Sequence, residues 1–218
     1  MDMEALERII TERRSIRKWK KKQVSDNLLK KAIELATWAP NGGNYQGWRF
    51  IVVKDSDLIE RMANTVQSVT DNIASWPEAT AWPEDIKRYR ENVSFFRNAP
   101  ACIGVLVSDY ISVMDKILMA RESFDDEAKQ ILAFRRSAPT AIQSAAAAVT
   151  TMLLALHNMG LGAVWLAAPL VAKKEIEGML NVPQAMNLMC LVAVGHPDES
   201  PQKDRKPVNQ VLEFIDRS

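Results

Sequence analysis

The sequence is poor in the residues that build metal sites and disulfides, with two cysteines and two histidines among 218 residues. Cys102 and Cys190 both lie in apolar runs, and a Cys-x-x-Cys pair is absent. No carboxylate cluster stands beside His157 or His196, and a lone histidine is more often structural than catalytic. We therefore expect neither a disulfide framework nor a metal site.

Two familiar signatures of enzymes are also missing. The nucleophile-elbow pattern Gly-x-Ser-x-Gly and the dinucleotide-binding pattern Gly-x-Gly-x-x-Gly do not occur. No acid, base or nucleophile stands out from its surroundings. A bound cofactor would then have to carry the chemistry of any enzymatic reaction.

Neither charge nor hydrophobicity is concentrated enough to indicate a nucleic acid or a membrane as a partner. Lysine and arginine total 28 against 27 aspartate and glutamate, a net charge of +1, which argues against a nucleic-acid surface. Polar residues interrupt the longest apolar stretch, residues 138–156, and we predict that it forms a buried helix. The N-terminus lacks an apolar signal segment. We expect a cytoplasmic protein.

The spacing of apolar residues predicts one α+β domain over residues 1–218. Strand character appears in residues 49–54, 101–108, 162–168 and 187–194. Helical patterns cover residues 3–12, 55–72, 115–134, 139–158 and 173–180, and a further helix ends near Pro40. Residues 75–97 combine prolines with aromatics, which predicts an excursion or lid whose aromatic side chains are candidate pocket walls. The polar tail, residues 207–218, carries one apolar stripe.

The first candidate site is the basic segment Arg13-Arg14-Ser15-Ile16-Arg17, which has a basic counterpart at Lys203 and Arg205. Guanidinium groups match the oxygens of a phosphate, and a serine hydroxyl can complete such a cradle. A local cationic cluster in a chain of balanced charge indicates one bound anionic group. The alternative is a solvated helix end that continues into the charged run at residues 18–22.

Two further segments could approach a ligand. The loop at residues 39–50 contains Gly42 and Gly43 together with three carboxamides (Asn41, Asn44 and Gln46), which offer donors and acceptors to the edge of a heterocycle. Glycines bracket the start of a strand at residues 160–169, and this strand ends in small residues that leave room for a planar group. An ordinary loop and simple strand packing are the respective alternatives.

Taken together and in order, these motifs resemble the FMN-dependent nitroreductase family over nearly the whole chain. The matching features are the Arg13–Arg17 segment, Pro40 followed by Asn44-x-Gln46-x-Trp48, the Gly160-Leu161-Gly162 turn, and Lys203-x-Arg205-x-Pro207. The resemblance implies a nitroreductase-like fold with a mostly antiparallel or mixed central sheet flanked by helices. It also implies an intertwined homodimer, a C-terminal tail that embraces the partner, and two FMN sites built from both chains.

The resemblance assigns residues to the cofactor as follows. Arg13, Arg14, Ser15, Lys203 and Arg205 would hold the phosphate and ribityl chain, and Arg17 would lie near the flavin pyrimidine. Pro40, Asn41, Gly42 and Asn44 of the partner chain would line the isoalloxazine, with Gln46 near it. The backbone of Ala167 and Ala168 would meet flavin N5. The family's usual Gln-Pro-Trp reads Gln46-Gly47-Trp48 here, and alanines replace its frequent acidic residue and glycine at 167 and 168.

The activity implied is hydride transfer from NADH or NADPH to flavin N5, followed by reduction of a small-molecule acceptor such as a nitroaromatic or quinone in a ping-pong scheme. The Arg17 guanidinium would stabilise negative charge around N1 and O2. Dehalogenation, dehydrogenation or flavin cleavage on the same fold is the alternative reaction. A non-enzymatic nucleotide-binding module is the alternative class.

Overall fold

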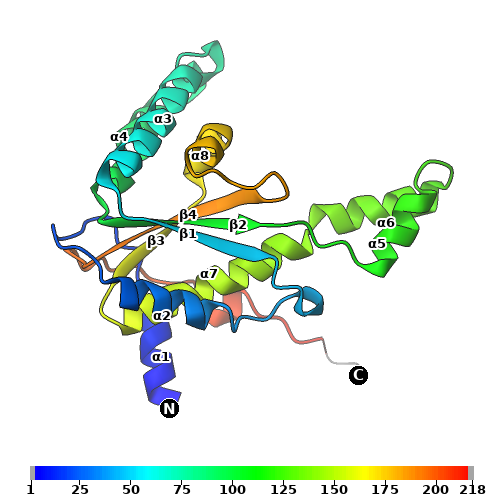
Figure 1. Cartoon of the computed structure of the whole chain (residues 1–218), viewed down its shortest axis with the longest axis horizontal. Coiled ribbons are helices and arrows are strands. Elements are labelled where there is room, and N and C mark those ends of the chain that lie inside the picture. Colours follow the sequence, from blue (N-terminus) through cyan, green and yellow to red (C-terminus); the bar gives the residue numbers. More distant parts are fainter. Residues whose placement is uncertain (1–2, 216–218) are drawn as a thin grey trace.

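The computed structural model describes residues 3–215 and is built around one four-stranded sheet (Figure 1). The strands are β1 (Trp48–Val53), β2 (Ala101–Val107), β3 (Gly162–Leu166) and β4 (Asn187–Gly195), in the spatial order β1-β2-β4-β3. All three pairings are antiparallel, with Phe50 opposite Val105, Gly104 opposite Leu191 and Val164 opposite Ala193. The predicted α+β class is confirmed, and the sheet is antiparallel throughout.

Helices cover both faces of the sheet. The helices α2 (Asp26–Ala36) and α7 (Thr140–Asn158) lie on one face, and α3 (Ser56–Ala74) and α8 (Lys173–Met179) lie on the other (Figure 1). Strand β2 contributes side chains to the cores on both faces of the sheet, because alternate side chains of a strand point to opposite faces. Ile103 and Val105 enter the α2–α7 core, whereas Cys102 and Leu106 enter the α3–α8 core.

The alanine-rich helix α7 lies beneath the sheet and is part of the core. Ala145, Ala148 and Val149 are buried together with residues of α2, where small side chains let the two helices approach closely. The helix ends at Asn158, as predicted. Gly160 follows with a φ of +74° and donates its N–H to the carbonyl of His157 at 2.9 Å. In the described chain, residues 126–158 are long and apolar enough to cross a membrane. That stretch is two helices, and α7 buries its apolar face within the protein.

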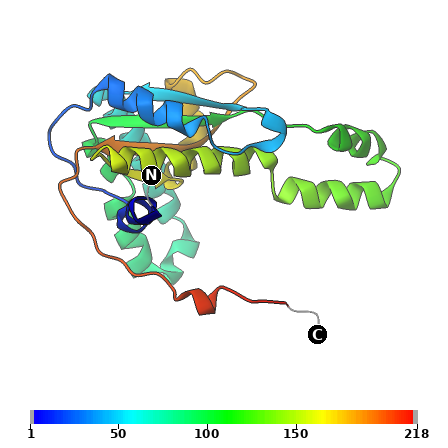
Figure 2. The same cartoon turned by 90° about the horizontal axis from the view of Figure 1, so that it is seen from below.

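The predicted single helix at residues 115–134 is wrong. The structure has two helices there, α5 (Val113–Arg121) and α6 (Asp126–Ser137), which form a hairpin that projects beyond the sheet (Figures 1 and 2). Asp125 caps α6 by accepting the N–H of Ala128 at 3.0 Å, and its carboxylate also pairs with Arg121 at 2.6 Å. This local capping starts a second helix where apolar periodicity alone predicts continuity.

The predicted excursion at residues 75–97 contains α4 (Pro83–Asn92) between the 3₁₀ helices Pro77–Ala81 and Phe95–Asn98, and α4 packs beside α3. Trp76, Trp82 and Tyr89 are exposed. Phe95 is part of the packing instead, because its ring stacks on Trp19 with centroids 6.1 Å apart. The role of this segment as a lid stays a prediction.

Both ends of the described chain are poorly covered. Helix α1 (Met3–Glu12) buries no residue, and Leu6 and Ile10 on it are exposed. The tail extends away from the sheet (Figure 2), with Val211 and Phe214 exposed. Residues 216–218 of the predicted tail lie outside the described residues.

Two helix N-termini provide a matched test of capping. The Asp55 carboxylate accepts the N–H groups of Asp57 and Leu58 at the start of α3, whereas Ser25 makes no side-chain cap at the start of α2. We expect Asp55→Ala to lower the free energy of unfolding by about 1 kcal/mol, because it removes a cap. Ser25→Ala should change it much less. Urea unfolding followed by circular dichroism measures both, and equal losses would contradict the assignment.

Candidate functional site

The basic segment after α1 is held along the exposed edge of β3. Ser15 forms a parallel bridge with Ala163, and the N–H of Ile16 donates to the carbonyl of Ala163 at 3.1 Å. A side chain at position 162 would place its Cβ 2.7 Å from Ile16. The glycine there therefore allows the segment to lie close to the strand. This contact places Arg13 and Arg14 beside the Gly160-Leu161-Gly162 turn.

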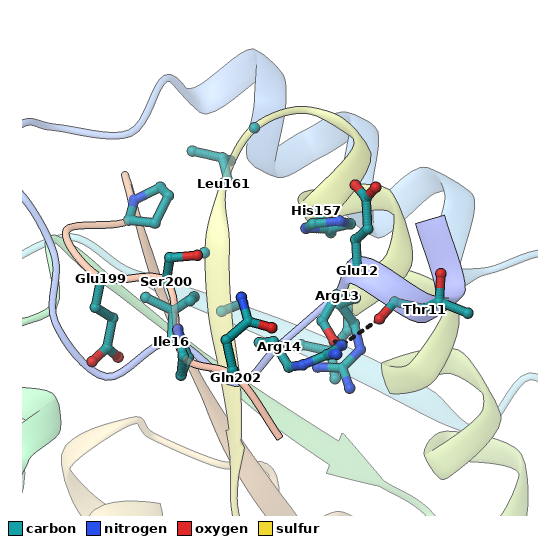
Figure 3. Close-up of a pocket in the computed structure, with 16 residues that line it drawn as sticks. Thr11, Glu12, Arg13, Arg14, Ile16, His157, Leu161, Glu199, Ser200 and Gln202 are labelled. Atoms are coloured by element: carbon teal, nitrogen blue, oxygen red, sulfur yellow. Dashed lines mark hydrogen bonds between the residues drawn. The ribbon is translucent and has the colours of Figure 1, made fainter. Parts of the chain in front are cut away.

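A cavity of about 470 Å³ opens at this point (Figure 3). Its walls come from four places in the sequence: the end of α1 with the basic segment, the last turns of α7, the Gly160–Gly162 turn, and residues 197–202. The polar and charged side chains that line it are those of Thr11, Glu12, Arg13, Arg14, His157, Glu199, Ser200 and Gln202. The sequence motifs at 13–14 and 160–162 thus meet in one cavity.

Positive charge gathers at the cavity. Arg13 is half-buried, and burial followed by the nearby charges of Arg205 and Arg14 lowers the pKa of its guanidinium. The structure therefore brings Arg205 close to Arg13, as the two basic motifs predict. An anionic group placed here would relieve the repulsion among the three guanidinium groups.

The side chain of Arg14 adds an unsatisfied donor. Its Nη1 donates to the carbonyls of Thr11 and, at 2.9 Å, Arg13. Its Nε is buried and has no hydrogen-bond partner within residues 3–215. Buried polar groups normally find a partner. The cationic cluster and this orphaned N–H together fit an anion such as a phosphate.

Arg17 lies apart from this cluster, and its backbone contacts Glu199. The Glu199 carboxylate accepts the backbone N–H groups of Arg17 and, at 3.1 Å, Lys18. The side chain of Arg17 is exposed, and its guanidinium carbon lies 6.0 Å from the ring centroid of Phe95. Arg17 does not line the cavity. The structure thus divides the basic segment into two places, one at Arg13 and Arg14 and one at Arg17.

The remaining predicted cofactor residues lie in the basic motifs and at the end of β3, and they take different positions. Ser15 is half-buried in the bridge to Ala163. Lys203 is exposed and outside the cavity lining. Ala167 is exposed at the end of β3, where its carbonyl accepts the N–H of Leu170 at 3.0 Å, and Ala168 begins the 3₁₀ helix Ala168–Ala172.

The carboxamide loop has its own internal structure. Asn41 Oδ1 accepts the N–H of Gln46 at 2.9 Å, and Gln46 Nε2 donates to Asn44 Oδ1 at 3.1 Å. Asn44 and Gln46 have φ of 51° and 53°. A Cβ on Gly42 would lie 2.2 Å from Thr140 Cγ2. Pro40, at the start of the loop, is exposed. These contacts seat the loop on the beginning of α7.

Within one chain, the carboxamide loop lies far from Arg13 and Arg14. The N–H of Gly42 donates to Ser144 Oγ at 3.2 Å, whereas His157 lines the cavity near the other end of the same helix. Thirteen residues of α-helix separate 144 from 157, which is about 20 Å at 1.5 Å per residue. The predicted loop residues are therefore far from the arginine cavity of the same chain. They are Asn41, Gly42, Asn44 and Gln46.

Besides Arg13 and Arg14, three titratable residues line the cavity that the sequence motifs do not include: Glu12, His157 and Glu199. His157 is a lone histidine in the sequence, yet it lies in the last turn of α7, three residues before Gly160. Its position just before the glycine turn is the feature of the sequence that could have identified it as a cavity residue. Burial, with Arg13 and Arg14 as further causes, lowers the pKa of His157, and Glu12 opposes that shift. No comparable signal marks Glu199.

Two relatives resemble the chain over nearly its full length. An iodotyrosine deiodinase of Thermotoga neapolitana is 27% identical over 218 residues, covering 96% of this chain and 97% of the relative. A 4-nitrobenzoate reductase of Nocardioides sp. is 25% identical over 228 residues, covering 98% of this chain and 91% of the relative.

Solved structures of similar fold also align with nearly the whole chain. A BluB-like flavoprotein of Clostridium difficile superposes with a TM-score of 0.84 at 27% identity, covering 99% of this chain and 100% of the other. An iodotyrosine deiodinase bound to FMN and 3-iodo-L-tyrosine superposes with a TM-score of 0.69 at 25% identity, covering 97% of each chain. The predicted nitroreductase-like fold is confirmed.

The family model described as the nitroreductase family matches residues 10–196. This range begins just before the basic segment and ends just after β4, so it contains the whole sheet and most of the cavity lining. The chain belongs to the nitroreductase family.

Proposed function

We propose that the protein is an FMN-dependent oxidoreductase that transfers hydride from NADH or NADPH to a nitroaromatic, quinone or related acceptor. The observation that carries this proposal is the cavity lined by Arg13 and Arg14, where Arg14 keeps an unsatisfied guanidinium N–H. Arg205 lies outside the cavity lining but close enough to Arg13 to lower its pKa. Membership of the nitroreductase family and the FMN-bound deiodinase of the same fold support it.

FMN, when bound, supplies a site that accepts a hydride and passes electrons to an acceptor. The chain itself would hold and position the cofactor. Arg13, Arg14 and Arg205 would neutralise the phosphate, with Ser15 and Lys203 beside them. The exposed Arg17 guanidinium lies apart from that cluster, and it would stabilise charge that develops on the flavin pyrimidine.

The end of β3 would present backbone donors to the reacting face of the flavin. Ala167 and Ala168 carry methyl side chains and contribute no titratable group. A proton needed at this place would therefore come from the substrate or from solvent, and the backbone N–H groups would contribute hydrogen bonds only. Trp76, Trp82 and Tyr89 are exposed at the excursion and remain proposed pocket walls.

A second copy of the chain would complete the site. The carboxamide loop and the arginine cluster lie near opposite ends of α7, so a loop from a partner chain would supply the other wall. The exposed apolar residues of α1 and of the tail, including Ile10 and Phe214, would be covered in such a homodimer.

Reductive dehalogenation is the second candidate reaction. The observation in its favour is the deiodinase relative, which aligns with almost the whole chain. It uses the same fold and cofactor but a halogenated aromatic acceptor. The two proposals differ in the oxidant alone.

The phosphate cradle predicts how FMN affinity responds to one arginine. Arg13→Ala should weaken FMN binding by on the order of 10- to 100-fold, because it removes a charge-assisted hydrogen bond of about 1.5–3 kcal/mol. Riboflavin, which lacks the phosphate, should bind wild type and variant equally. Flavin fluorescence quenching measures both. Arg88→Ala on α4, which removes an exposed Arg88–Asp85 pair, is the matched control. An unchanged FMN affinity in Arg13→Ala would reject the cradle.

Stopped-flow mixing separates the two reactions. Anaerobic addition of NADH or NADPH should bleach the visible absorbance of the flavin, and a nitroaromatic or quinone should restore it. We expect these acceptors to restore the absorbance faster than 3-iodotyrosine does. The reverse order would favour dehalogenation, and a protein that neither nucleotide reduces would refute the NAD(P)H-dependent reductase.

Subunit mixing tests the two-chain site. Arg13→Ala/Arg14→Ala disables the cradle, and Asn44→Trp places an indole on the exposed loop. Each homodimer should retain little FMN. Coexpression should restore about a quarter of the wild-type flavin content, because half of the dimers are mixed and each has one intact site. If both halves of a site come from one chain, no flavin returns on mixing.

A further inference from the structure

His157 is the titratable group of the cavity that the proposed function leaves without a role. It lies in the last turn of α7, is half-buried, and points its ring into the space beside Glu12 and above Arg13 and Arg14 (Figure 3). Its backbone carbonyl accepts the N–H of Gly160, but no side-chain hydrogen bond holds the ring among residues 3–215. The imidazole is thus free to interact with a ligand.

Charges of both signs surround this ring. Arg13 and Arg14 approach it from the basic segment, and Glu12 approaches from the end of α1. Glu199 faces the same cavity from residues 197–202, and β3 contributes no charged residue. Burial and the two arginines outweigh Glu12, so the pKa of His157 lies below its ordinary value of 6.5. The imidazole is therefore mostly neutral at pH 7 while the cavity holds no anion.

A phosphate group would reverse this balance. A phosphate monoester carries a charge of about −1.5 to −2 near neutral pH. Placed beside Arg13 and Arg14, it would offset the repulsion that these two arginines exert on an imidazolium. An opposite charge a few ångströms away favours the charged form of a titratable group.

We propose that His157 takes up a proton when a phosphate group enters the Arg13–Arg14 cavity, so that this chain holds a phosphorylated cofactor more tightly at mildly acidic than at mildly alkaline pH. The identification of that phosphate with the phosphate of FMN rests on the proposed function. The proton resides on an imidazole nitrogen of His157 and comes from solvent. His157 is thereby a binding residue whose contribution depends on pH.

The direction of the pH dependence follows from linkage. Below the pKa of the ligand-free protein His157 is protonated in both states, and above the pKa of the bound protein it is neutral in both. Between these limits binding takes up a proton, and affinity rises as the pH falls. A rise of one pKa unit on binding corresponds to a tenfold gain in affinity.

The test compares FMN affinity at pH 5.5 and 8.5 in three proteins. The phosphate of FMN itself titrates, with a second pKa of about 6. Wild type and His157→Gln share this contribution, so it cancels when the gains in affinity of the two proteins are compared. We expect wild type to gain about tenfold more affinity on acidification than His157→Gln. His196→Gln, which changes the other histidine outside the cavity lining, should behave as wild type.

Calorimetry in two buffers of different ionisation enthalpy adds a direct readout. Wild type should take up a fraction of a proton on binding FMN near pH 7 that His157→Gln does not. Riboflavin should cause no uptake. His157→Lys, with a fixed charge, should bind FMN tightly without the histidine-dependent step, which keeps the test decisive if His157→Gln folds poorly.

The outcomes separate this inference from the function. Equal pH dependence in wild type and His157→Gln, together with FMN binding, would overturn the role of His157 alone. Failure of FMN to bind any of the proteins would instead refute the proposed cofactor. In that case inorganic phosphate replaces FMN in the calorimeter, and an absence of His157-dependent proton uptake would then overturn the inference as well.

Discussion

The site depends on the close approach of residues 15–20 to the edge of the sheet. Ile16 lies against Gly162, and the Trp19 indole Nε1 donates to the carbonyl of Gly162 at 2.9 Å. Gly195 makes a similar contact possible, since a Cβ there would lie 2.8 Å from Trp19. On the far side, Lys20 donates its N–H to the carbonyl of His196 at 2.9 Å. A side chain at either glycine would push the basic segment off the sheet and disperse the cationic cluster.

Helix α7 sets the distance between the carboxamide loop and the cavity. Its beginning supports the carboxamide loop through Ser144 and Thr140, and its end supports the cavity through His157. The small residues Ala145 and Ala148 let α2 and the sheet close around it. The helix is therefore both the centre of one core and a spacer that keeps the carboxamide loop and the cavity at its opposite ends. A site built from two chains is the arrangement that this spacing favours.

The chain supplies little reactive chemistry of its own. Burial raises the pKa of both thiols, Cys102 and Cys190, to about 12, which makes thiolate chemistry unfavourable at neutral pH. What the cavity offers is charge and hydrogen-bond donors. This composition is typical of enzymes in which the protein binds and orients a cofactor and the cofactor carries out the reaction.

The α+β class, the four strands and the buried helix α7 with its end at Asn158 were predictable from the sequence. These features follow from the spacing of apolar residues and from glycine, both of which act locally. The helix at residues 115–134 was predicted wrongly because the Asp125 cap starts a new helix within an otherwise continuous apolar pattern.

The composition of the cavity was decided by the tertiary structure alone. The Glu199 carboxylate accepts the backbone N–H of Arg17, a residue 182 positions away in the sequence, and Arg205 lies near Arg13 although it comes from the other end of the chain. His157 gains its environment only when α7 ends beside α1. No local pattern encodes such meetings, because charge and burial depend on which distant segments the folded sheet brings together.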